Sequence, residues 1–464
     1  MVRNMLIKDT IAAIATPFGE GGIGVIRISG TEAKEIGQKI LRMKQEQEYL
    51  NFIPRQVYYG KVIDYHTKNT LDEVLFFYSP KPKSFTAEDT LEIQAHGGMY
   101  SLGRILASVV AAGARIAEPG EFSKRAFLNG RIDLMQAESI IDLIRAKTDK
   151  AQQLALTQLT GRTSEGLYKI EAMLYEILVS IEAILDFPEE GLPEIVRQEL
   201  LTKSKQFGMQ VQQLLEDYDE GRKIRDGIMI VIVGQPNVGK SSLLNWFLAE
   251  ERAIVTDIPG TTRDLIEAQI QLQGIPVRLI DTAGIRETNH PIEQIGIEKA
   301  KKALLSADLI LWLLDASQAF NEVDFEFYSL IQDKKILLVL NKTDLPKQLN
   351  QIELAKFEQI PVLEISLMNK SGLDQLEQEI CNQVGIGKIQ IDDRPILSQI
   401  RHKQALLKTK LALESFEYGL SLQISEDLLA IDLREALTAL AEITGKNVTA
   451  EVVHGIFSQF CIGK

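Results

Sequence analysis

The most constraining feature of this sequence is a glycine-rich loop that separates an apolar run from a helical pattern. Residues 234–242 read GQPNVGKSS and match G-x-x-x-x-G-K-[ST] at every fixed position, directly after the apolar run 228–233. In a strand, loop and helix of this kind, backbone N–H groups and the positive end of the helix surround a phosphate, and Lys240 reaches its oxygens. Ser241 supplies a hydroxyl for Mg²⁺. The sequence therefore predicts a nucleoside triphosphate site rather than a chance glycine turn.

Two further motifs supply groups that respond to the γ-phosphate. Thr261 and Thr262 precede a predicted strand, and a threonine there can close onto Mg²⁺ and the γ-phosphate as a switch. Asp281 begins the motif DTAG at the end of another predicted strand. Its carboxylate can hold Mg²⁺ through water, and the N–H of Gly284 can sense the γ-phosphate.

The last two motifs predict that the base is guanine. Residues 341–344 read NKTD at the end of a predicted strand, and Ser366-Leu367 follow the next one. The carboxylate of Asp344 can accept hydrogen bonds from the ring N–H and the amine of guanine, a donor pair that adenine lacks. A DxxG or an NKxD motif alone is a weak signal, but these motifs in this order, each at a strand end, predict a guanine-nucleotide domain.

Composition narrows the class of protein and its surroundings. The formal net charge of −13 argues against broad nucleic-acid binding. Two cysteines, Cys381 and Cys461, cannot form a disulfide framework, and no signal peptide or membrane span is expected, which predicts a cytoplasmic protein. His96 has no second histidine or cysteine at metal-ligand spacing, so a structural histidine held by backbone groups is expected. Local basic faces are either partner sites or solvated helix surfaces; the candidates are Lys299, Lys301, Lys302, Arg401, Lys403, Lys408 and Lys410.

The periodicity of apolar residues divides the chain into four segments. Residues 1–118 are predicted to be mixed α/β, 119–222 helical, 223–384 alternating strands and helices, and 385–464 helical again. The third segment predicts a doubly wound, mostly parallel sheet, with one antiparallel edge strand beside Gly274. The residues leave open whether the helices form one domain that carries an insertion or two separate bundles.

These motifs resemble one family over the whole chain. TDIPGTTRD at 256–264, the phosphate loop, DTAG followed by Ile285 and Arg286, the flanking helices and a terminal CIGK together resemble the tRNA-modifying GTPase family MnmE (TrmE). The resemblance implies a translation-factor-type P-loop GTPase domain inserted in an all-helical domain. It also implies an N-terminal α+β domain like the tetrahydrofolate-binding aminomethyltransferases, which forms a constitutive homodimer.

The resemblance also implies how hydrolysis is catalysed. Ras-like enzymes orient water with a glutamine after DTAG, where this chain has Ile285. In this family K⁺ replaces an arginine finger, and the K⁺ ligands implied are Asn237, Thr256, Ile258 and Thr261; Asn237 is alternatively a turn-former. Glu293, or alternatively Glu287, would orient water through a bridging water. The implied Mg²⁺ ligands are Ser241, Thr262 and Asp281, and the catalytic residues are Glu293, Asn237, Lys240 and Thr262. The predicted GTP-binding residues are Asn237, Val238, Gly239, Lys240, Ser241, Ser242, Thr256, Thr261, Thr262, Asp281, Thr282, Ala283, Gly284, Asn341, Lys342, Asp344, Ser366 and Leu367.

A second site is implied for 5-formyl- or methylene-tetrahydrofolate. Its residues match Arg27, Glu92, Arg131 and Lys464, and Arg131 stands where some relatives carry lysine. The resemblance places a flexible CIGK tail beside this site, which makes Cys461 a candidate nucleophile or redox group, or merely a tethered thiol.

The function implied is a K⁺- and Mg²⁺-dependent GTPase that acts with the flavoprotein MnmG, in a heterotetramer or larger complex. The pair would install an aminomethyl or carboxymethylaminomethyl group on the tRNA wobble uridine. Two alternatives remain: a ribosome-assembly GTPase, which would need an RNA module that the acidic C-terminus lacks, and a nucleotide-gated binding module.

Overall fold

The structure is a computed structural model, and it describes residues 9–43, 52–185, 193–249, 267–281, 302–349, 357, 359–387, 389 and 394–464. The chain divides into two compact units. The first contains residues 1–141, 158–207 and 408–464, and the second contains residues 142–157 and 208–407. Among the described residues, no helix is long and apolar enough to cross a membrane.

The first unit begins with a seven-stranded sheet in the order β3-β4-β5-β6-β2-β1-β7. Neighbouring strands are antiparallel except β1 and β7, which run parallel. The strands are β1 (Ile11–Ile14), β2 (Ile23–Ser29), β3 (Leu41–Met43), β4 (Tyr58–Ile63), β5 (Thr70–Ser79), β6 (Thr90–His96) and β7 (Arg115–Ile116). The helices of this part are α1 (Ala33–Ile40) and α2 (Met99–Ala111).

Strand β1 shows why this sheet is covered on two sides. Ala12 and Ile14 belong to the core that α1 and α2 complete. Ile11 and Ala13 point to the opposite face, where they pack with Phe122. Because side chains alternate along a strand, the sequence IAAI is apolar at every position only if both faces are buried.

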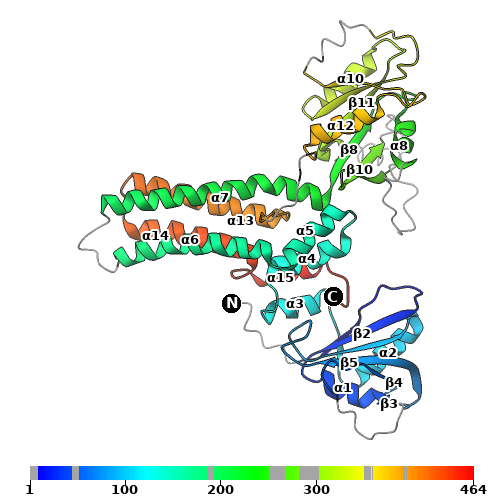
Figure 1. Cartoon of the computed structure of the whole chain (residues 1–464), viewed down its shortest axis with the longest axis vertical. Helices are drawn as coiled ribbons and strands as arrows, with labels where there is room; N and C mark the ends of the chain where they lie inside the picture. Colours follow the sequence, from blue (N-terminus) through cyan, green and yellow to red (C-terminus); the bar gives the residue numbers. More distant parts are fainter. Residues whose placement is uncertain are drawn as a thin grey trace, which may run out of the picture. The chain divides into compact units, whose positions relative to one another are not determined.

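The helices of the first unit come from distant parts of the chain. Helix α6 (Arg162–Leu185) packs along α14 (Glu426–Thr444), as Figure 1 shows. Ion pairs of 2.8 Å between Arg434 and Glu182 and of 2.7 Å between Lys446 and Glu171 link these helices and their ends. The sequence left open one helical domain or two bundles. This packing shows that helices from both helical segments of the chain lie together in the first unit. The other helices of residues 119–226 and 400–457 are α3 (Glu121–Leu128), α4 (Leu134–Arg145), α5 (Asp149–Leu159), α7 (Glu194–Asp226), α13 (Ile400–Ser421) and α15 (Ala450–Phe457).

The second unit is built on a six-stranded sheet in the order β13-β12-β11-β8-β10-β9. All neighbouring strands are parallel except β9 and β10. Its strands are β8 (Ile228–Val233), β9 (Glu267–Leu272), β10 (Ile275–Asp281), β11 (Leu309–Asp315), β12 (Ile336–Asn341) and β13 (Val362–Glu364). Its helices include α8 (Lys240–Ala249), α10 (Glu322–Ile331) and α12 (Leu373–Val384).

The predicted antiparallel edge strand is confirmed, and its turn explains the register. Gln273 and Gly274 join β9 to β10, with φ angles of 49° and 77°. Two central residues with positive φ form the type of turn whose twist matches that of a hairpin. The hairpin therefore places Arg278 of β10 opposite Gln269 of β9.

Candidate functional site

The phosphate loop leaves β8 through three residues with positive φ. The φ angles are 148° at Gly234, 66° at Asn237 and 108° at Gly239. A Cβ atom at Gly234 would overlap the carbonyl oxygen of Leu313, and one at Gly239 would overlap the side-chain amide of Asn341. Glycine is therefore required at both ends of the loop for steric as well as conformational reasons. Asn237 is exposed, and its left-handed backbone is one that asparagine tolerates.

The side chain of Lys240 reaches back across the phosphate loop. Its Nζ donates hydrogen bonds of 2.8 Å to the carbonyl oxygens of both Gly234 and Gln235. Burial lowers the pKa of the Lys240 ammonium below its usual value, and the nearby charge of Asp281 partly opposes this. Gln235, which the sequence does not mark as a functional residue, donates bonds of 2.8 Å from its side-chain amide to Asn321 and Asp324 at the start of α10. These contacts fix the position of the loop and of the ammonium above it.

Ser241 and Asp281 meet although forty positions separate them. The Ser241 hydroxyl donates a hydrogen bond of 3.1 Å to Oδ2 of Asp281. The parallel pairing of β8 with β10 brings these two strand ends together. A hydroxyl and a carboxylate are suitable ligands for Mg²⁺, because this ion prefers oxygen ligands. Mg²⁺ needs only one or two ligands from the protein when phosphate groups supply further oxygen ligands. Among the described residues no group of three or more His, Cys, Asp or Glu side chains could hold a metal, so these two oxygens would act with the nucleotide.

Asn341 connects the phosphate loop to the loop that follows β13. Its side chain is buried, donates a bond of 2.8 Å to the carbonyl of Val238 and accepts one of 3.2 Å from the amide of Leu367. The side-chain amide of Asn341 therefore holds the phosphate loop at a fixed distance from the loop that is predicted to bind the base.

Asp344 and Ser366 lie together, as the motif order predicts. The Ser366 hydroxyl donates to Oδ1 of Asp344, which orients the carboxylate. Lys342, in a left-handed conformation with φ of 65°, pairs with Asp315 at 2.7 Å. Burial raises the pKa of the Asp315 carboxyl, but hydrogen bonds from Lys342 and Ser317 outweigh it and lower the pKa. Asp315 was missed by the sequence analysis; its signal is an acidic residue that ends the buried apolar strand β11.

Several predicted site residues lie outside the described residues. They are Thr256, Ile258, Thr261 and Thr262 before β9, Thr282, Ala283 and Gly284 after β10, and Glu293 with its alternative Glu287. The described site therefore contains the phosphate loop, Asp281 and the base-binding loops.

The four predicted folate residues lie near one another in the first unit. Arg27 and Glu92 stand opposite each other on β2 and β6, and their side chains form an ion pair of 2.8 Å. The guanidinium of Arg27 lies 4.8 Å from the ring centroid of Phe85, and that of Arg131 lies 5.2 Å from it. Phe85, which the sequence analysis missed, thus contacts both cations.

The terminal CIGK segment is tied down rather than loose, which corrects the expectation of a flexible tail. The amide of Phe122 donates a bond of 3.2 Å to the carbonyl of Lys464, and the amide of Gly120 donates one of 3.4 Å to that of Cys461. The carbonyl of Gly463 accepts a bond of 3.4 Å from Arg27. The Cys461 thiol itself is exposed.

His96 is held by a side chain and not by backbone groups as expected. Its Nδ1 lies 2.7 Å from Oδ1 of Asp72, and its backbone amide donates to the same carboxylate at 2.9 Å. The hydrogen bond to Asp72 raises the pKa of the exposed His96 ring.

The fold and this arrangement of motifs define the class of protein. A mostly parallel doubly wound sheet carries a phosphate loop at the end of β8, a carboxylate at the end of β10 and the NKxD motif at the end of β12. Ligands of such sheets bind beyond the carboxyl ends of the strands. The second unit therefore contains a P-loop GTPase domain, and this fold implies a guanine nucleotide with Mg²⁺.

Comparison with known proteins identifies the family. The MnmE helical domain model matches residues 134–461, and the model of the GTP-binding protein TrmE N-terminus matches residues 10–131. The tRNA modification GTPase MnmE of Desulforamulus reducens is 47% identical over 99% of this chain and 100% of its own length. The protein of the same name from a Thermoanaerobacter species is 45% identical over the same shares. The chain belongs to the MnmE family.

Among solved structures, Era of Aquifex aeolicus bound to GDP and AlF₄⁻ is 27% identical over 40% of this chain and 66% of that chain. Its TM-score is 0.29, which is too low to carry an argument about function.

Proposed function

We propose that this chain is a K⁺- and Mg²⁺-dependent GTPase that forms 5-carboxymethylaminomethyl or aminomethyl uridine at the wobble position of tRNA. It would act with the flavoprotein MnmG, and a folate would supply the carbon. The relatives named tRNA modification GTPase MnmE support the substrate class. The observation that carries the GTPase part is the convergence of Lys240, Ser241 and Asp281 at the ends of β8 and β10.

In this proposal the described residues bind and orient the triphosphate. Backbone N–H groups of the loop and the Lys240 ammonium contact the phosphate oxygens, and Asp344 selects guanine. Ser241 and Asp281 would hold Mg²⁺ together with Thr262, and Asn237 would hold K⁺ together with Thr256, Ile258 and Thr261. When bound, these cations would offset the charge that develops on the transferred phosphoryl group. Glu293, or alternatively Glu287, would orient the attacking water.

The second proposed site binds 5-formyl- or methylene-tetrahydrofolate. Glu92 would accept hydrogen bonds from the pterin, and Arg27, Arg131 and Lys464 would contact the rest of the ligand. The ion pair between Arg27 and Glu92 supports this, because it holds the carboxylate in one orientation. The exposed thiol of Cys461 would serve beside this site as a nucleophile or redox group, the alternative being a merely tethered thiol.

The proposed assembly is a homodimer, joined through the N-terminal domain, that associates with MnmG in the cytoplasm. Tyr59 and Leu75 support the dimer, because they face each other on β4 and β5 and are 46% and 42% exposed. The proposed domains are 1–118, 119–222, 223–384 and 385–464, the last with the CIGK tail.

Steady-state GTP hydrolysis by the purified chain tests the proposal. The rate in KCl should greatly exceed the rate in NaCl at equal ionic strength, because K⁺ would take the place of an arginine finger. Slow and equal rates in the two salts would contradict K⁺ catalysis and favour a nucleotide-gated binding module.

A further inference from the structure

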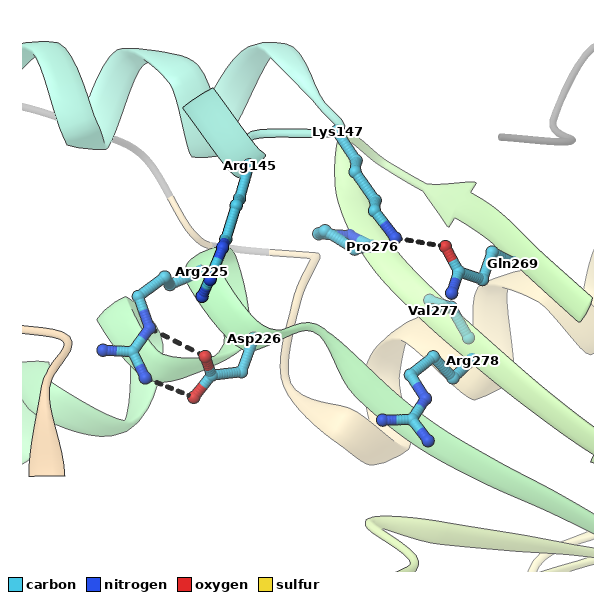
Figure 2. A pocket seen from close by; sticks show the side chains of 8 residues that line it. All are labelled: Arg145, Lys147, Arg225, Asp226, Gln269, Pro276, Val277 and Arg278. Carbon is cyan, nitrogen blue, oxygen red and sulfur yellow. Dashed lines mark hydrogen bonds and ion pairs between the residues drawn. The ribbon is translucent and has the colours of Figure 1, made fainter. Parts of the chain in front are cut away.

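A polar pocket lies beside the β9–β10 hairpin, away from the nucleotide motifs. It has a volume of about 380 Å³. Figure 2 shows Arg145 and Lys147 reaching into it from the end of α4 and the segment after it, Arg225 from the end of α7, and Arg278 from β10. The full lining consists of Arg145, Lys147, Arg225, Asp226, Gln269, Pro276, Val277 and Arg278.

The charge of this lining is strongly unbalanced. Four of its side chains are cationic and one, Asp226, is a carboxylate. Asp226 pairs with Arg225 through bonds of 2.7 and 2.8 Å, and among the described lining residues the cationic side chains outnumber the carboxylates by three. The whole chain carries −13, so this excess is not a reflection of its composition. Because like charges repel, bringing these groups together favours an anion among them.

Arg225 retains hydrogen-bonding capacity. Its Nη1 is buried and has no hydrogen-bond partner among the described residues, whereas its Nε and Nη2 bind Asp226. A buried donor without an acceptor is unfavourable, and guanidinium groups suit phosphate oxygens. Lys147 donates to Oε1 of Gln269, which orients the lysine above β9.

The lining also indicates which part of a ligand it takes. Among the residues that the structure describes, the lining has no aromatic ring and its apolar side chains are those of Pro276 and Val277, which offer no surface on which a base or a pterin would stack. Its volume is near the lower end of about 300–1,000 Å³ for ligand pockets, which is enough for a sugar and phosphate unit. We propose that this pocket binds backbone phosphates of the tRNA; this rests on the proposed function.

The basic face of α13 is a weaker candidate for the same role. Lys403 pairs with Asp219, Lys408 with Glu442 and Lys410 with Glu414. These contacts support the interpretation of that face as a solvated helix surface.

The test is binding of labelled tRNA to the full chain with GDP present, measured by fluorescence anisotropy over a range of salt concentrations. Arg145→Glu combined with Arg278→Glu should weaken binding by about tenfold or more and reduce the salt dependence, because phosphate contacts are lost. Lys408→Glu combined with Lys410→Glu is the control, since it changes the charge equally and should alter the affinity by less than about twofold. Both variants should bind GDP as the unaltered chain does, which verifies folding.

Four outcomes would overturn the proposal. Equal tRNA affinity in the pocket variant and the unaltered chain would show that the pocket does not bind tRNA, while leaving the proposed function intact. Equal losses of affinity in the two variants would show the same. Absence of tRNA binding by the unaltered chain would contradict both the pocket assignment and the proposed function. Tripolyphosphate binding that is lost in the pocket variant while tRNA binding is unchanged would assign the pocket to a small phosphorylated ligand.

Discussion

At the scale of single residues, Asn237 has two explanations that one substitution separates. Its φ of 66° suits a turn-former, and its exposed amide suits a K⁺ ligand. Asn237→Gly keeps the backbone accessible and removes only the amide. We expect this variant, like Asn237→Ala, to hydrolyse GTP more slowly and to lose K⁺ stimulation, with GDP affinity within about threefold because the loop is retained. The measurement is hydrolysis in KCl and NaCl; K⁺ stimulation that persists in Asn237→Gly would identify a turn-former.

His96 gives a residue-scale prediction about pH. Asp72 raises the pKa of its ring above the ordinary histidine value of 6.5, so folding favours the protonated form. The stabilisation is therefore present in full below pH 6.5 and is lost as the pH rises through the folded-state pKa. An NMR titration should show the raised pKa in the unaltered chain and a lower one in Asp72→Asn. Identical titrations would exclude the ion pair.

At the scale of elements, Asn341 is expected to hold the loops after β8 and β13 together. Asn341→Ala leaves the Val238 carbonyl and the Leu367 amide without their partner. We expect a loss of about 2–4 kcal/mol in the free energy of unfolding of the second unit, since an unpaired buried carbonyl at Val238 and an unpaired, partly buried amide at Leu367 are both costly. GDP affinity should fall as well, and urea denaturation with GDP titration measures both.

The matched control for this substitution is Asn369→Ala, in the same loop region. Asn369 is exposed and only its backbone amide makes a bond that the structure records, to the Ser366 hydroxyl. Its effect should stay within about 0.5 kcal/mol. A similar loss in both variants would show that Asn341 does not join the loops.

At the scale of the whole molecule, the two units should unfold in distinguishable steps. Trp246 and Trp312 are the two tryptophans of the chain, and both lie in the second unit. Tryptophan fluorescence therefore follows that unit, whereas far-UV circular dichroism follows both. GDP at a hundredfold excess over its Kd should stabilise the fluorescence transition by about 2.7 kcal/mol, since only the folded site binds it.

A destabilising substitution in the first unit should change the circular dichroism transition and leave the fluorescence transition unchanged. Leu174 of α6 is fully buried, so Leu174→Ala should cost about 2–5 kcal/mol. We expect the circular dichroism transition of the first unit to shift while the fluorescence transition stays in place. Coincident shifts in both signals would mean that the units unfold together.

Much of the second unit was predictable because its motifs are local. The phosphate loop, the edge hairpin at Gly274 and the positions of Asp281 and Asp344 follow from short patterns at the ends of apolar runs. Gln235 and Asp315 were not predicted, because their roles depend on partners elsewhere, α10 for Gln235 and Lys342 for Asp315. Nothing local distinguishes such residues from ordinary polar loop positions.

The sequence by itself determined the class of nucleotide site, because phosphate, Mg²⁺ and guanine each require fixed residue types at fixed short spacings. Only the tertiary structure decided that α6 packs against α14, that Phe85 contacts both Arg27 and Arg131, and that the terminal segment is bound near Arg27. These contacts join residues that lie far apart in the chain. Apolar periodicity shows that a helix face is buried but not which partner covers it, since the hydrophobic effect is not directional.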